Sequence, residues 1–176
     1  MYLALFFVLC KKNRDANMND AQNDNKEQKR SYDFPVLIID DDKWMHRLIT
    51  NFLRKKGLEA ISAMDPVEGL ALAIKYRPIV IFLDMVMPIT SGTVLLQMLK
   101  KIEITKHIPV IAVSGNFSQK LLTEAVNFGA NSFVSKPFTQ EILEEKLAKA
   151  IDEETLAKAA AMQDRKNQAA TNDLKQ

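Results

Sequence analysis

The sequence predicts an α/β fold, a doubly wound five-stranded parallel sheet with helices on both faces. From residue 34 onward, short apolar runs alternate with amphipathic stretches, which is the pattern of βα repeats. The runs Ile79–Leu83 and Val110–Val113 are continuous and rich in branched residues, as expected for strands covered on both faces. A length of 176 residues is enough for one domain with a buried core.

Five strands and five helices are expected in alternation. The strands are Val36–Ile39, Leu58–Ser62, Ile79–Leu83, Val110–Val113 and Ser132–Val134. The helices lie near Lys43–Lys56, Pro66–Lys75, Gly92–Lys101 and Gln119–Phe128, and the last starts near Thr139. Gly57 and Gly129 stand where glycine commonly ends a helix, and Pro78 and Pro109 stand just before strands.

The last helix is predicted to be the longest. Its apolar residues keep helical spacing as far as Ile151, and the Ala-, Glu- and Lys-rich sequence after Asp152 has high helix propensity. We expect the helix to run past the core into solvent and to fray from Gln163. The chain thus divides into an apolar start with a leader (1–33), a core domain (34–152) and a helical extension with a frayed tail (153–176).

The first 33 residues carry no fold signal. Residues 1–10 are apolar, but a spanning helix needs roughly 20 such residues, and a signal peptide would have a basic start and a cleavage site. Two readings stay open: an upstream extension, with translation starting at Met18, or a weak membrane-associating segment. Residues 13–33 are too polar to order themselves, so we expect a disordered leader.

Composition narrows the class of protein. The net charge of +2 argues neither for nor against a nucleic-acid partner. The basic residues are interspersed with acidic ones and form no basic stripe, and no nucleic-acid partner is expected. Cys10 is the only cysteine, which excludes an internal disulfide or a cysteine-rich metal site and favours the cytoplasm. His46 and His107 stand isolated, and we interpret both as surface or packing residues.

Four of the five strands end in polar groups: Asp40-Asp41-Asp42, Asp84, Ser114 and Lys136. Each has an ordinary explanation alone, since Asp42 could cap a helix and Lys136 or Ser114 could be a solvated turn residue. Asp84, which directly follows five apolar residues, is harder to explain, because burying an unpaired carboxylate is unfavourable. Parallel strands deliver these groups to one edge of the sheet, where carboxylates and a lysine could hold a divalent cation and an anion.

In order and spacing, residues Phe34 to Ile151 resemble the receiver domain of two-component response regulators, most of all the single-domain type typified by the chemotaxis response regulator. The matching motifs are Asp40-Asp41 in LIIDDD, Asp84 in FLDMVMP with Gly92 downstream, Ser114 in AVSG and Lys136 in KPF. The resemblance implies a flavodoxin-like sheet of order 2-1-3-4-5.

The resemblance also implies the roles of the acidic residues. Asp84 would be the phosphoacceptor, whose carboxylate attacks phosphorus to form an acyl phosphate. Asp41 and Asp84 would bind Mg²⁺ directly, with the backbone carbonyl of Val86 as a third ligand, and Asp40 would hold a metal-bound water.

Lys136 would pair with the phosphoryl oxygens and Ser114 would donate a hydrogen bond to one of them. Pro137 is expected to follow a cis peptide bond. Ser114 and Phe133 match the family's switch pair, although serine and phenylalanine replace the commoner threonine and tyrosine. Phosphorylation would shift the population of states at the surface of residues 119–150, where a downstream protein would dock.

The leading hypothesis is a stand-alone phosphoacceptor, a monomer or weak dimer without a membrane partner, that receives its phosphoryl group from a histidine kinase or a phosphotransfer protein and signals by protein binding. About 25 residues follow the fifth helix, too few for a helix-turn-helix domain. The alternatives are a phosphorelay intermediate that passes the group to a histidine, and an adaptor that dimerises through its last helix.

An enzyme is not expected beyond self-catalysed phosphoryl acceptance and hydrolysis. Phosphatases of the haloacid dehalogenase type also use an aspartate nucleophile and Mg²⁺. They need a second aspartate two positions further on, where this chain has Val86. The same residue offers no polar side chain to an attacking water, so the phosphoryl lifetime stays open.

Overall fold

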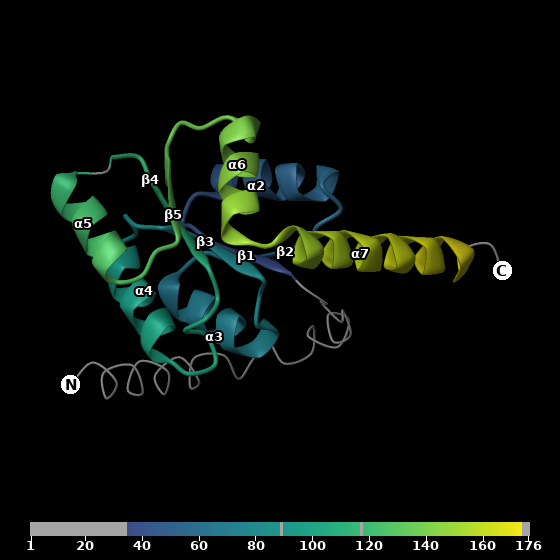
Figure 1. Cartoon of the computed structure of the whole chain (residues 1–176), viewed down its shortest axis with the longest axis horizontal. Coiled ribbons are helices and arrows are strands. Elements are labelled where there is room, and N and C mark those ends of the chain that lie inside the picture. Colours follow the sequence, from purple (N-terminus) through teal and green to yellow (C-terminus); the bar gives the residue numbers. More distant parts are fainter. Residues whose placement is uncertain (1–34, 89, 117, 174–176) are drawn as a thin grey trace, which may run out of the picture. The chain divides into compact units, whose positions relative to one another are not determined.

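The computed structural model describes residues 35–88, 90–116 and 118–173, and the side chains of 162, 163 and 166–173 are not described. The predicted apolar start and leader lie outside these ranges. The five strands are β1 (Val36–Ile39), β2 (Ala60–Ala63), β3 (Val80–Asp84), β4 (Val110–Ser114) and β5 (Ser132–Ser135). All pairings are parallel and the order is β2-β1-β3-β4-β5, which confirms the predicted flavodoxin-like sheet (Figure 1).

Helices cover both faces of the sheet. Figure 1 shows α2 (Lys43–Lys55) and α6 (Gln140–Ala150) on one side, with α3 (Pro66–Tyr76) and α4 (Gly92–Lys101) on the other and α5 (Gln119–Asn127) beside α4. All residues of β1, β3 and β4 are buried, as their continuous apolar sequences predict. Phe52 and Phe82 are among the largest fully buried side chains, in the core cluster that α2 and α6 close.

The register of the strands places the polar strand ends together. Ile39 pairs with Leu83, so the next residues, Asp40 and Asp84, lie side by side at the carboxyl edge. Ser114 pairs with Ser135, so Lys136 follows at the same edge. The predicted convergence of these groups is thus a consequence of parallel pairing.

The helix ends follow their local sequence. Asp42 caps α2, because its Oδ1 accepts a hydrogen bond of 2.8 Å from the backbone N–H of Trp44. Gly57 and Gly129 have φ angles of +69° and +88°, the left-handed conformation that glycine adopts without a Cβ clash. The ordinary explanation of Asp42 as a helix cap is therefore correct.

The prediction of one continuous last helix is wrong. Helix α6 ends before Ile151, whose φ of −131° and ψ of 138° are extended, and a second helix, α7, follows (Glu153–Asp173). Burial of the Ile151 side chain favours the break, and Asp152 accepts hydrogen bonds from the backbone N–H and the hydroxyl of Thr155. The helix continues past Gln163, where we expected fraying.

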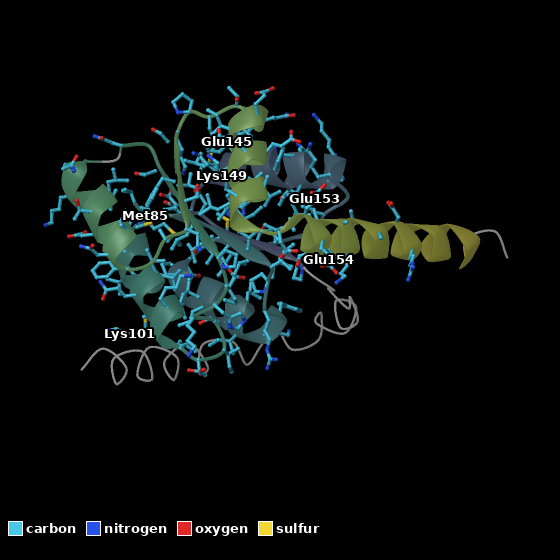
Figure 2. The ribbon with its side chains drawn as sticks, viewed as in Figure 1. Met85, Lys101, Glu145, Lys149, Glu153 and Glu154 are labelled. Carbon is cyan, nitrogen blue, oxygen red and sulfur yellow. The ribbon has the colours of Figure 1, made fainter. Side chains whose placement is uncertain are left out.

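The first turns of α7 belong to the core. Ala159 is 4% exposed and Leu156 packs against the same core cluster as α2 and α6. Ala160 lies against Gly57, after the end of α2. Figure 2 shows Glu153 and Glu154 at the start of α7. It also shows Glu145 and Lys149 on α6, and these two side chains form an ion pair with an N···O distance of 2.6 Å. Within the described ranges, no helix has the length and apolarity to cross a membrane.

Candidate functional site

Three carboxylates meet at the carboxyl edge of the sheet. One oxygen each from Asp40, Asp41 and Asp84 lies within 4.8 Å of the other two. Asp40 and Asp84 are buried, whereas Asp41 is exposed to solvent. The structure therefore brings together the three acidic residues that the sequence singled out.

Asp84 ends β3 and is held at both carboxylate oxygens. Its Oδ1 accepts a hydrogen bond of 2.8 Å from the backbone N–H of Val86, and its Oδ2 lies 2.7 Å from Nζ of Lys136. The side chain of Val86 is 63% exposed in the loop that follows. The carboxylate of Asp84 is thus oriented by the main chain on one side and by a cation on the other.

Lys136 joins two of the carboxylates. Its Nζ donates hydrogen bonds of 2.7 Å to Oδ2 of Asp40 and to Oδ2 of Asp84. Burial opposes the charge of this ammonium group, but the hydrogen bonds to Asp40 and Asp84, together with the negative charges of both carboxylates, outweigh burial and raise the pKa of Lys136. The lysine therefore stays protonated at neutral pH and is available to an anion.

Asp40 shows the opposite balance. Burial raises the pKa of this carboxyl group above its ordinary value, although the hydrogen bonds from Lys136 and from the backbone N–H of Asp42 act to lower the pKa. Repulsion from the charge of Asp84 adds to the rise. The ionised form of Asp40 is therefore less favourable in the folded chain than in water, mainly because the group is buried.

The remaining predicted residues lie on β4, on β5 and just after β5. Ser114 ends β4 fully buried, and its hydroxyl donates to the backbone oxygen of Asn116 at 3.1 Å, within its own turn. The backbone N–H of Lys136 donates to the oxygen of Ser114 at 2.7 Å, and the peptide bond from Lys136 to Pro137 is cis. Phe133 is half-buried on β5.

Gly92 shapes the loop after Asp84. A Cβ atom at this position would lie 2.0 Å from the carbonyl oxygen of Asp84 and 2.7 Å from Cα of Met85. Real Cβ contacts are essentially never this short, so only glycine lets α4 begin directly against the chain at Asp84 and Met85. The motif glycine thus has a steric reason in this chain.

The sequence did not reveal the contact that His46 makes with Asp40. The residue is buried, and its Nε2 lies 2.6 Å from the main-chain oxygen of Asp40. Its position six residues after Asp40, one turn inside α2, was the only signal that the sequence offered. His107 is exposed, as predicted.

The donor set suits a hard divalent cation. Carboxylate oxygens are the ligands that Mg²⁺ prefers, and Mg²⁺ keeps several waters, which the exposed side of Asp41 can accommodate. Three carboxylates whose oxygens lie this close together would gain from added positive charge. The residues present therefore fit Mg²⁺.

The chain is similar to known receivers in sequence. The family model described as the response regulator receiver domain matches residues 36–160. Chemotaxis protein CheY of Pseudomonas aeruginosa is 34% identical over 65% of this chain and 93% of its own length. The DNA-binding dual master transcriptional regulator RpaA of Synechocystis is 33% identical over 60% of this chain, which spans only 44% of that relative.

Solved structures agree with the sequence comparison. Chemotaxis protein CheY4 of Vibrio cholerae has a TM-score of 0.64 at 28% identity, over 66% of this chain and 98% of that one. A CheY-like receiver domain protein from Methanospirillum hungatei has a TM-score of 0.62 at 26% identity, over 73% of this chain and 97% of its own. With the site geometry above, these matches show that the chain belongs to the family of response regulator receiver domains of two-component signalling.

Proposed function

We propose that this receiver accepts a phosphoryl group on Asp84 from a phosphohistidine of a sensor histidine kinase or a phosphotransfer protein, and signals by phosphorylation-dependent protein binding in the cytoplasm. The observation that carries the proposal is the placement of Asp84. Its carboxylate sits at a strand end, 2.7 Å from the ammonium of Lys136 and beside two further carboxylates. A nucleophile, a cation for the phosphoryl oxygens and a metal-ligand set are thereby combined.

The transfer step follows from this arrangement. A carboxylate oxygen of Asp84 attacks phosphorus and forms a P–O bond, while the P–N bond to the donor imidazole breaks and its electron pair stays on nitrogen. The imidazole leaves neutral when its other nitrogen carries a proton. Lys136, which is protonated at neutral pH, pairs with the phosphoryl oxygens as charge develops on them.

The acidic residues are proposed to hold Mg²⁺. Asp41 and Asp84 would ligate Mg²⁺ directly, with the backbone carbonyl of Val86, and Asp40 would hold a metal-bound water. When bound, the ion supplies positive charge that offsets the carboxylate and phosphoryl oxygens. The protein turns over only its own acyl phosphate in this proposal, so it is not an enzyme acting on other substrates.

The donor protein is proposed to approach along α2. Trp44 is 71% exposed, Leu48 is 38% exposed, and the guanidinium of Arg47 lies 5.5 Å from the centre of the Trp44 ring. The helix carries several basic residues and no acidic one. An apolar and basic surface beside the acceptor suits a helical donor protein with an acidic rim.

The output surface is proposed to be the region of residues 119–150. Ser114 would turn its hydroxyl from its own turn toward the phosphoryl group, and the ring of Phe133 would move into the space left. Ala125 is the one buried residue of α5, and Val126 is 55% exposed, so this helix is loosely anchored and presents apolar surface. A downstream protein could read a shift there.

Acetyl phosphate labelling tests the proposal. Wild-type protein with Mg²⁺ should gain the mass of one phosphoryl group, and the gain should vanish in Asp84→Asn and without Mg²⁺. Asp65→Asn is the matched control, since Asp65 only caps α3 and should leave labelling intact. Labelling that persists in Asp84→Asn would refute the assignment of the acceptor.

A further inference from the structure

His46 makes a contact that ordinary packing does not require. The ring lies in α2 and only 8% of the residue is exposed. Its Nε2 is 2.6 Å from the main-chain oxygen of Asp40. A carbonyl oxygen only accepts hydrogen bonds, so Nε2 must carry the hydrogen and act as the donor. The contact therefore fixes the tautomer of the ring.

The second nitrogen of the ring argues against a packing role. Nδ1 is buried and has no hydrogen-bond partner among the described residues. An unpaired buried polar atom is unfavourable, and a phenylalanine would fill the same space without one. The hydrogen bond from Nε2 is what this position gains from a histidine.

Asp40 is the residue on which that hydrogen bond acts. Its backbone N–H donates to the oxygen of Ala63 at 3.2 Å, its Oδ1 accepts from the N–H of Asp42 and its Oδ2 accepts from Lys136. The contact to Lys136 would weaken when a cation or a phosphoryl group entered. The bond from His46 goes to the main chain, so it does not depend on the charge of the carboxylate.

We propose that His46 is a positioning residue of the acceptor site. Its Nε2–H holds the carbonyl of Asp40 and so sets the direction in which Asp40 and Asp41 leave β1, which determines the affinity of the acidic cluster for Mg²⁺. The inference rests on the proposed function, because it concerns the same acidic cluster. It adds a residue from inside α2 that touches neither the ion nor the phosphoryl group.

The test measures Mg²⁺ binding by the full chain, using the fluorescence of Trp44 and calorimetry as two readouts. His46→Phe keeps the ring volume and removes the donor, and should weaken Mg²⁺ binding about tenfold, as other residues behind metal ligands do. His46→Gln carries an amide N–H at a similar reach and should stay within about twofold of wild type. Nitrogen NMR of the wild-type imidazole should show the Nε2–H tautomer.

Phe52→Leu is the matched control, because it trims another buried side chain of α2. It should lower the urea midpoint and leave Mg²⁺ affinity unchanged. Equal Mg²⁺ affinity in wild type and His46→Phe would overturn the role of His46 alone, as would a wild-type ring protonated at Nδ1 only. The NMR result decides the matter if His46→Phe fails to fold. Failure of the wild-type chain to bind Mg²⁺ would instead overturn the proposed function.

Discussion

The ammonium nitrogen of Lys136 lies 2.7 Å from Oδ2 of Asp84, although 52 positions separate the two residues in the chain. The lysine makes an equal contact with Asp40. In our proposal, the ammonium group that would receive the phosphoryl group is therefore already held by the carboxylate of Asp84 before that group arrives. Loss of Lys136 should therefore affect stability as well as chemistry.

Lys136→Met should destabilise the fold by about 2 kcal/mol at neutral pH, because it leaves two buried carboxylates without their cation. The raised pKa of Lys136 means that its contribution is present below the ordinary value of 10.5 and is lost as the pH rises through the folded-state value. Urea unfolding from pH 7 into the alkaline range should show the two proteins converging. A constant difference at all pH values would contradict this account.

Asp40→Asn should stabilise the protein at pH 7 while weakening Mg²⁺ binding. Burial raises the pKa of Asp40, so the ionised carboxylate is less favourable in the folded chain than in the unfolded one. Asparagine removes that charge and can keep the hydrogen bond from the N–H of Asp42. The gain should disappear as the pH falls below 3.8, where the unfolded carboxyl group is also protonated. Urea midpoints at pH 7 and pH 3 measure the effect, and a variant less stable than wild type at pH 7 would refute it.

The sequence was sufficient for the fold and for the gathering of the acidic residues. Alternating apolar and amphipathic segments specify parallel strands, and parallel strands place residues such as Asp40 and Asp84 at one edge whatever the details of packing. Strand boundaries were less certain, since β2 begins at Ala60 and the apolar run begins at Leu58. Leu58 is nevertheless buried, so its side chain packs in the core although the residue lies in a loop.

Two features depended on tertiary contacts that no local pattern encodes. The contact of His46 with Asp40 requires a particular rotation of α2 against β1, and a lone histidine in a helix gives no sign of it. The break at Ile151 was equally hidden, because the residues on both sides favour a helix. Burial of that side chain and the cap by Asp152 decide the outcome.

Gly92→Ala should destabilise the fold by about 3 kcal/mol, since its Cβ would lie 2.0 Å from the carbonyl oxygen of Asp84 and the loop would have to move. Labelling of the acceptor should fall as well. Gly115→Ala is the matched control, because nothing lies within 4 Å of its added Cβ. Thermal unfolding and acetyl phosphate labelling of both variants test the prediction. Equal effects of the two substitutions would mean that the close approach at Gly92 is relaxed in solution.

The first two turns of α7 should be needed for stability, and the rest of the helix should not. Leu156 and Ala159 pack against the core, whereas Asp164 and Arg165 are exposed. A chain that ends at Asp152 loses this cover and should be destabilised by about 2 kcal/mol, from the apolar area returned to water. A chain that ends at Arg165 should stay within about 0.5 kcal/mol of the full chain.

Urea unfolding, monitored by circular dichroism, compares the stability of the two truncated chains with that of the full chain. Light scattering measures the mass of each chain in solution. Lower stability of the shorter chain at an unchanged monomer mass would assign α7 to the receiver core. A fall in mass on removing residues 166–176, with stability unchanged, would instead favour an adaptor that dimerises through the outer part of the helix. Equal midpoints for all three chains would show that the contact of Ala160 with Gly57 contributes nothing to the fold. The two truncations therefore separate a stabilising helix from an assembling one, because burial of Leu156 and Ala159 ends well before Arg165.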